Sequence, residues 1–322
     1  MGAMAFTVRT PGLVLTEHEF QIPLDHGQPG GESITVFARE VADPDGLDRP
    51  YLVFLQGGPG FEAPRPTRHP SSSGWMDRAL ADHRVLMLDQ RGTGRSTPVG
   101  AATLADRTPQ QQAEYLTHFR ADSIVRDAEF IRQALGVERW TVLGQSFGGF
   151  TLLNYLSAAP EGLAAAYFTG GLPPIGMHPD EIYSATFRRM IERNRRFYDR
   201  YPGDADRVRQ LHKQVTDGQF SLPDGDVLTW RRFRQHGNKL GMSPGAEELH
   251  YLLETPFDAP GFRHDVAHPM AFARNPIYAI LHEACYADGF ATNWSAERVQ
   301  PAQYEDDVTL FTGEHVLSLI HI

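Results

Sequence analysis

The chain has 322 residues, of which 41% are hydrophobic and 22% charged, a composition typical of a folded globular protein with a real core. Its net charge of -10 and the lack of any lysine-rich or arginine-rich tail argue against a nucleic-acid partner. The single Cys285 excludes an internal disulfide, and no apolar stretch reaches the ~20 residues of a membrane helix. The first residues lack the apolar run of a signal peptide, so we expect a cytoplasmic protein without a membrane partner.

Short apolar runs alternate with helical patterns in the first half, which is typical of an α/β protein with a mostly parallel sheet. Residues 34–41 alternate apolar and polar side chains, as in a strand with one buried face. Further runs are almost continuously apolar, as in strands buried on both faces: residues 51–56, 84–89, 140–145 and 164–170. A helix is predicted over 122–136, with Asp122 or Ser123 as its N-cap and Gly136 as its end.

The pattern changes near residue 173, where prolines cluster and long polar helices replace the strands. We therefore divide the chain into a core (1–172), an inserted helical cap (173–305) and the start of a returning segment (306–322) that opens with a strand-like run near residue 310. One cap helix, roughly residues 182–201, carries many arginines, which we interpret as a solvent-exposed face.

The stretch GQSFG, residues 144–148, places a serine between glycines where an apolar strand gives way to a helical run. This is the context of the G-x-S-x-G nucleophile elbow, a sharp turn that exposes the serine hydroxyl. Small neighbours let strand and helix approach, and the turn aims the backbone N–H of Phe147 at developing negative charge. We therefore expect Ser146 to be a nucleophile and Phe147 to contribute to an oxyanion hole.

Two glycine-rich loops accompany the elbow. The first, QGGPG at residues 56–60, follows an apolar strand, and we expect Gly58 to bring a second N–H donor to the oxyanion; the alternative is an ordinary glycine-rich turn. In the second, DQRGTGRS at residues 89–96, we expect Asp89 and Arg91 to pair and hold the loop, a structural role.

These three motifs, in this order and at these separations, resemble the proline iminopeptidase family of α/β-hydrolases. The resemblance covers residues 10–172 well and continues more loosely through the helical insert. It implies an α/β-hydrolase fold with a helical cap and release of an N-terminal residue, proline or another small one, from short peptides through an acyl-enzyme on Ser146. Gln56 stands where many members carry histidine, so the resemblance assigns it no catalytic role.

Such an enzyme must bind a free ammonium group, and in the family cap carboxylates do so, one of them in a segment reading I-E-x-x-Y. Glu283 and Tyr286 have that spacing, so the resemblance makes Glu283 the amine-binding candidate; the alternative is that Glu283 caps or salt-bridges a cap helix. A second carboxylate could come from Glu247, Glu248 or Glu254. His282 has no second histidine at metal spacing, so we expect neither a metal site nor a cofactor.

Acyl transfer by serine also needs a histidine base oriented by a carboxylate, and in α/β-hydrolases both come late in the chain. Glu314 could be the acid and His315 or His321 the base, but too few residues follow for the strand and helix that normally precede the base. We therefore assign no acid or base. We expect a chain cut short or shifted in frame near residue 316, which would lack the final core strands and expose an apolar sheet edge.

Two other functions remain open on the sequence. An esterase or amidase of the same fold would not need Glu283. A non-catalytic α/β-hydrolase-like binding protein is favoured by the missing triad histidine. An aspartate-nucleophile hydrolase is disfavoured, because the elbow presents serine.

Overall fold

The computed structural model describes residues 4–67, 74–218, 220–268 and 274–314 and divides into two compact units. Unit 1 comprises Met1–Pro173 together with Asn275–Leu281, and unit 2 comprises Pro174–Arg274 together with His282–Ile322. The sequence-based division differs in two places. Residues 275–281 belong to the unit that contains the sheet, and residues 306–314 belong to the unit that contains the cap helices.

Unit 1 is built on a seven-stranded sheet in the order β1-β2-β3-β5-β4-β6-β7. Its strands are β1 (Met4–Thr10), β2 (Leu13–Pro23), β3 (Ser33–Ala42), β4 (Tyr51–Leu55), β5 (Arg84–Leu88), β6 (Trp140–Gln145) and β7 (Leu163–Thr169). The first four in spatial order pair antiparallel, and β5, β4, β6 and β7 run parallel. The predicted α/β class and the central strands are confirmed.

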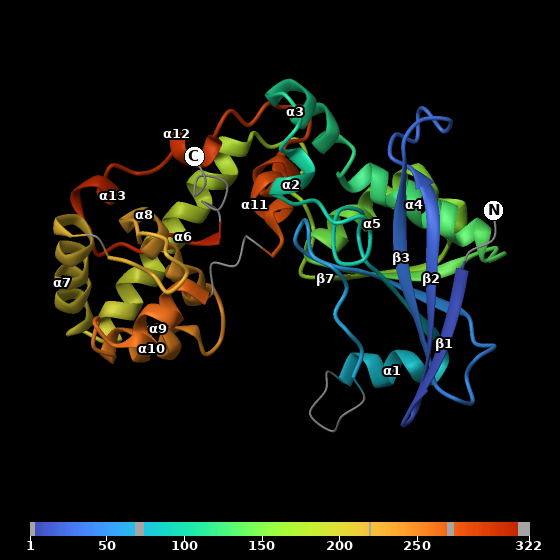
Figure 1. Cartoon of the computed structure of the whole chain (residues 1–322), viewed down its shortest axis with the longest axis horizontal. Helices are drawn as coiled ribbons and strands as arrows, with labels where there is room; N and C mark the ends of the chain where they lie inside the picture. Colours follow the sequence, from blue (N-terminus) through green and yellow to red (C-terminus); the bar gives the residue numbers. More distant parts are fainter. Residues whose placement is uncertain (1–3, 68–73, 219, 269–273, 315–322) are drawn as a thin grey trace. The chain divides into compact units, whose positions relative to one another are not determined.

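Helices cover both faces of this sheet. Helix α1 (Gly74–Asp82) lies on one face, and α4 (Ala121–Ala134) and α5 (Phe147–Ala158) lie on the other (Figure 1). The α1 face buries a cluster that includes Leu52, Phe54, Met76, Leu80 and Met87. Unit 1 also contains α2 (Ala101–Leu104), α3 (Pro109–Thr117), the 3-10 helix η1 (Pro160–Gly162) and all of α11 (Pro276–His282) except its last residue.

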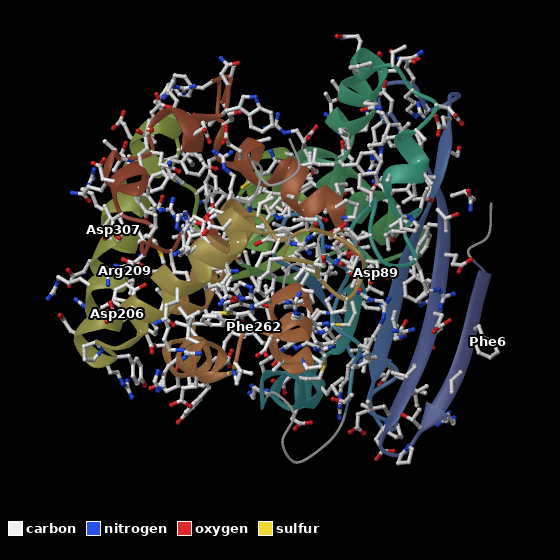
Figure 2. All side chains as sticks on the ribbon, turned by 60° about the vertical axis from the view of Figure 1, so that its left-hand side comes forward. Phe6, Asp89, Asp206, Arg209, Phe262 and Asp307 are labelled. Atoms are coloured by element: carbon white, nitrogen blue, oxygen red, sulfur yellow. The ribbon has the colours of Figure 1, made fainter. Side chains whose placement is uncertain are left out.

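Local details of unit 1 differ from prediction. Helix α4 begins after Arg120, which is extended, so neither Asp122 nor Ser123 is its N-cap; both lie in its first turn. Gly136 does end it, with a φ of 68° that favours glycine. Strand β7 is not buried on both faces: it lies at the edge of the described sheet, and Tyr167 is 54% exposed. The exposed ring Phe6 marks the opposite edge, on β1 (Figure 2).

Unit 2 is helical in its described part. Its elements are α6 (Pro179–Arg200), α7 (Asp204–Asp217), α8 (Trp230–Arg234), η2 (Gln235–Gly241), α9 (Gly245–Glu254), α10 (Pro260–Ala267), the end of α11 (Pro276–His282), η4 (Glu283–Tyr286), α12 (Ser295–Arg298) and α13 (Gln303–Asp306). Its core packs aromatic rings such as Phe197, Phe233 and Phe262 against leucines of α7 and α9. The α6 arginines at 188, 189, 193, 195 and 196 are exposed, as predicted.

The predicted strand near residue 310 is wrong. Residues 307–313 form turns and extended chain, and their backbone groups bond to helices instead of a neighbouring strand. The Phe311 N–H donates to Asn194 Oδ1 (2.8 Å), and the Thr312 N–H donates to the Arg234 carbonyl (2.9 Å). Within the described ranges, no helix combines the length and apolar composition needed to cross a membrane.

Candidate active site

Ser146 occupies the bend between β6 and α5 with φ 52° and ψ -122°. A positive φ is uncommon outside glycine and costs about 1–3 kcal/mol, which the surrounding structure must offset. Two backbone bonds hold the bend: the Ser146 N–H donates to the Thr169 carbonyl (3.0 Å), and the Gly149 N–H donates to the Ser146 carbonyl (2.8 Å). The predicted strand, sharp turn and helix are therefore present, with the serine at the turn.

The glycines after Ser146 are required by close approach between backbones. A Cβ on Gly148 would lie 2.0 Å from the Leu55 carbonyl oxygen, and one on Gly149 would lie 2.1 Å from the Gly171 carbonyl oxygen. A larger residue at 148 would push α5 away from β4, and one at 149 would push it away from the chain after β7. As the first residue of α5, Phe147 also leaves its N–H without an acceptor inside the helix, so this N–H is available as a donor.

The QGGPG turn lies against the serine. A Cβ on Gly57 would lie 2.9 Å from Ser146 Cβ and 3.5 Å from its Oγ. Gly58 and Gly60 have φ of 123° and 89°, which side chains disfavour. The sequence singled out Gly58 and missed Gly57, although both belong to the same motif. The turn thus brings backbone close to Ser146, the arrangement that a backbone N–H donor to an oxyanion requires.

The loop after β5 is held differently from the prediction. Asp89 does not pair with Arg91: its buried carboxylate (Figure 2) accepts two bonds from Arg65 (both 2.9 Å) and one from the Arg95 N–H (3.0 Å). Arg91 instead donates to Asp127 on α4 (Nε to Oδ2, 2.7 Å) and to main-chain carbonyls. The Asp89 carboxylate and the Arg91 guanidinium are both buried. Each can make more hydrogen bonds than a single ion pair between them would satisfy.

No base for Ser146 is found among the described residues of unit 1, where its Oγ has no hydrogen-bond partner. Two histidines there are engaged elsewhere: His18 contacts Glu40 (3.2 Å), and His26 contacts Asp127 (2.9 Å). His315 and His321 lie outside the described residues. Glu314 is described, is exposed and belongs to unit 2.

Glu283 is buried in unit 2, and its two oxygens accept from the backbone N–H groups of Ser295 (2.8 Å) and Ala296 (3.3 Å) at the start of α12. Glu283 therefore caps a helix, which the sequence analysis gave as the alternative to amine binding. The two are compatible, because each carboxylate oxygen keeps a further lone pair.

Two neutral phenols and a second carboxylate act electrostatically in the region of Glu283. Burial, with the charge of Glu283, raises the pKa of Tyr183, and burial with the charges of Cys285 and Glu314 raises that of Tyr286, so both phenols are neutral. Burial lowers the pKa of His282, although Glu314 and Glu283 oppose this shift. The sequence did not connect Glu314 with this cluster, because nothing local in the chain indicates it.

The other carboxylates considered for the amine are already paired with basic groups. Glu247 pairs with Arg200 (2.5 Å), Glu248 with Lys239 (2.6 Å) and Glu254 with His250 (3.3 Å). Over the described ranges, no three His, Cys, Asp or Glu side chains converge in a way that could hold a metal.

Comparison with known proteins agrees with this geometry. Residues 50–260 match the family model described as the alpha/beta hydrolase fold. The chain is 48% identical to a proline iminopeptidase of Aeromonas sobria over 320 residues, which cover 95% of this chain and 74% of that protein. It is 33% identical to a proline iminopeptidase of Aspergillus aculeatus over 333 residues, 96% of this chain and 73% of that one. The chain therefore belongs to the proline iminopeptidase family of α/β-hydrolases.

Proposed function

We propose that this protein is a serine aminopeptidase that releases N-terminal proline, or another small residue, from short peptides. The supporting observation is the strained Ser146 bend with the QGGPG turn against it, in a chain 48% identical to a proline iminopeptidase. A cytoplasmic location and the lack of a nucleic-acid partner stay predictions of the sequence.

In the proposed reaction, Ser146 Oγ attacks the carbonyl carbon of the N-terminal residue while a base takes its proton. The carbonyl oxygen becomes an oxyanion that accepts from the N–H groups of Gly58 and Phe147. The peptide nitrogen then leaves with a proton, and the N-terminal residue remains as an ester on Ser146. Water hydrolyses this ester and regenerates the hydroxyl.

Glu283 is the proposed partner of the substrate ammonium. A buried cation left unpaired costs several kcal/mol, so a site that selects free N-termini needs a carboxylate in a water-poor setting. Glu283 is 4% exposed and lies among neutral tyrosines. The charge of Glu314 acts on Tyr286 and His282 and adds negative potential to the same cluster.

The test is a comparison of proline p-nitroanilide with its N-acetyl derivative and with p-nitrophenyl acetate, with Ser146→Ala as the background. We expect the free-amine anilide to be cleaved at least 100-fold faster than the acetylated one. Equal cleavage of both would favour the esterase or amidase. Lack of turnover, with no fluorophosphonate adduct on Ser146, would favour the binding protein.

A further inference from the structure

A short segment from far along the chain packs on the QGGPG turn. Residues 275–281 belong to unit 1, although the chain leaves this unit after Pro173. Ile277 is 1% exposed, and Asn275, Tyr278 and Ala279 are also buried. The next residue, Ile280, is 45% exposed, so the segment has one buried and one open side.

Ile277 contacts both glycine-rich loops of the site. A Cβ on Gly60 would lie 2.7 Å from Ile277 Cγ2 and also 2.7 Å from the Tyr278 backbone nitrogen. A Cβ on Gly92 would lie 2.9 Å from Ile277 Cδ1. The Ile277 side chain thus packs against two turns, at Gly60 (φ 89°) and at Gly92 (φ 84°). Both φ values lie in the region that favours glycine.

Two further contacts fix the segment to the residues after the turn. The rings of Phe61 and Tyr278 lie 4.6 Å apart at an angle of 57°. Asn275 Nδ2 donates to Glu62 Oε2 at 3.3 Å. The segment therefore contacts the end of the turn at Gly60 and the residues after it, Phe61 and Glu62, close to Gly57, which approaches Ser146.

An oxyanion donor on a glycine turn needs such support. Glycine gives the backbone freedom that must be removed before the N–H can point steadily at a developing charge. Gly57, Gly58 and Gly60 have no side chain that could supply this packing, so part of it has to come from residues outside the turn. A misplacement of about 1 Å can cost on the order of 100-fold in rate.

We propose that Ile277 is a positioning residue that holds the Gly57–Gly60 turn in place beside Ser146. This inference rests on the proposed function of that turn as an oxyanion donor. Ile277→Ala removes the contacts with Gly60 and Gly92, and Ile277→Val removes only the terminal methyl group. Ile280→Ala is the matched control, because it makes the same change on the open side of the same helix.

We expect Ile277→Ala to lower kcat for proline p-nitroanilide about 10- to 100-fold with KM within about threefold, and to slow fluorophosphonate labelling of Ser146 in parallel. Ile277→Val should stay within about threefold of the wild type, and Ile280→Ala should equal it. Amide hydrogen exchange in the peptide 55–63 should quicken in Ile277→Ala, quicken less in Ile277→Val and stay unchanged in the Ile280 variants. A loss of thermal stability with unchanged kcat, labelling and exchange would overturn the proposal.

The outcomes separate this proposal from the proposed function. If the wild type labels but does not cleave prolyl substrates, the aminopeptidase activity fails, while labelling still measures the effect of Ile277. If the wild type does not label, hydrogen exchange alone decides. If Ile277→Ala does not fold, Ile277→Val is compared with Ile280→Val, and equal exchange in the two would contradict the proposal.

Discussion

The guanidinium of Arg91 and the carboxylate of Asp127 form a two-point ion pair in the interior of unit 1, with both side chains at most 1% exposed. The pair joins the loop after β5 to helix α4, and Arg91 also donates to the carbonyls of Leu24 and His118. Removal of one partner from such a pair leaves an uncompensated buried charge, which is far more costly than losing an exposed pair.

Asp127→Ala should therefore lower the free energy of unfolding by about 3–5 kcal/mol, because it leaves the buried Arg91 guanidinium without a counter-charge. Asp122→Ala on the same helix is the control. Its pair with Arg126 is exposed and 3.7 Å long, so the change should be less than about 1 kcal/mol. Urea unfolding measures both variants, and a similar loss in the two would contradict the role assigned to Asp127.

Gly148→Ala should lower the free energy of unfolding by at least about 1–3 kcal/mol and abolish labelling of Ser146, because the new methyl would lie 2.0 Å from the Leu55 carbonyl oxygen. Gly261→Ala, in an exposed part of α10 with no atom within 4 Å of the new methyl, should be neutral or stabilise by up to about 1 kcal/mol. Thermal unfolding and fluorophosphonate labelling read out the two effects.

The strain at Ser146 predicts an unusual order of stabilities. Glycine accepts φ 52°, ψ -122° more readily than alanine, so Ser146→Gly should be more stable than Ser146→Ala by about 1 kcal/mol, and both should be inactive. Ser157 is an exposed position near the end of α5, and there the alanine variant should be more stable than the glycine variant by about 1 kcal/mol. Chemical denaturation of the four variants gives the comparison. If Ser146→Ala were at least as stable as Ser146→Gly, the bend would not be strained.

Glu283→Gln should lower kcat/KM for proline p-nitroanilide about 10- to 100-fold, because the substrate ammonium loses its counter-charge. Hydrolysis of p-nitrophenyl acetate should change less than about threefold. Glu297→Gln makes the same substitution at an exposed position of α12 and should leave both activities intact. Equal loss on both substrates would mean that Glu283 acts only as the cap of α12.

Burial lowers the pKa of His236 to about 4, from an ordinary value of 6.5. The folded state therefore holds this ring neutral, and the unfolded state binds more protons between these two values. Its contribution to stability is present above pH 6.5 and is lost as the pH falls toward 4, by about 2 kcal/mol between pH 7 and pH 5.

His236→Gln should flatten the pH dependence of urea unfolding between pH 5 and 7 relative to the wild type. Part of the slope should remain, because burial lowers the pKa of His282 as well. His264→Gln, at an exposed position of α10, should leave the slope unchanged. An unchanged slope in His236→Gln would contradict the burial effect.

The elbow could be predicted because its chemistry is local. A strand, a serine between glycines and a helix are contiguous in the sequence, and the glycines at 148 and 149 are dictated by the approach of the strand and loop beside them. The buried central strands could be predicted for the same reason, since a continuous apolar run marks burial on both faces.

The partners of the polar residues could not be predicted, because they come from distant segments. Asp89 and Arg91 are two residues apart and carry opposite charges, yet Arg65 and Asp127 bond them instead. The return of Ile277 to unit 1 has no local signal either, since its apolar neighbours suit any buried helix. Strand β7 has an apolar sequence that suggests a central strand, but its position at the edge of the described sheet decides its exposure.

The membership of residues 275–281 in unit 1 limits how this architecture can be recombined. The polypeptide passes between the units three times, after Pro173, Arg274 and Leu281. A chimera that takes the helical unit of a relative as one continuous block would also import a foreign replacement for Ile277 and Tyr278. Grafts should therefore be made in two pieces that leave the native seven-residue stretch in place, so that the helical unit can be exchanged without disturbing the QGGPG turn.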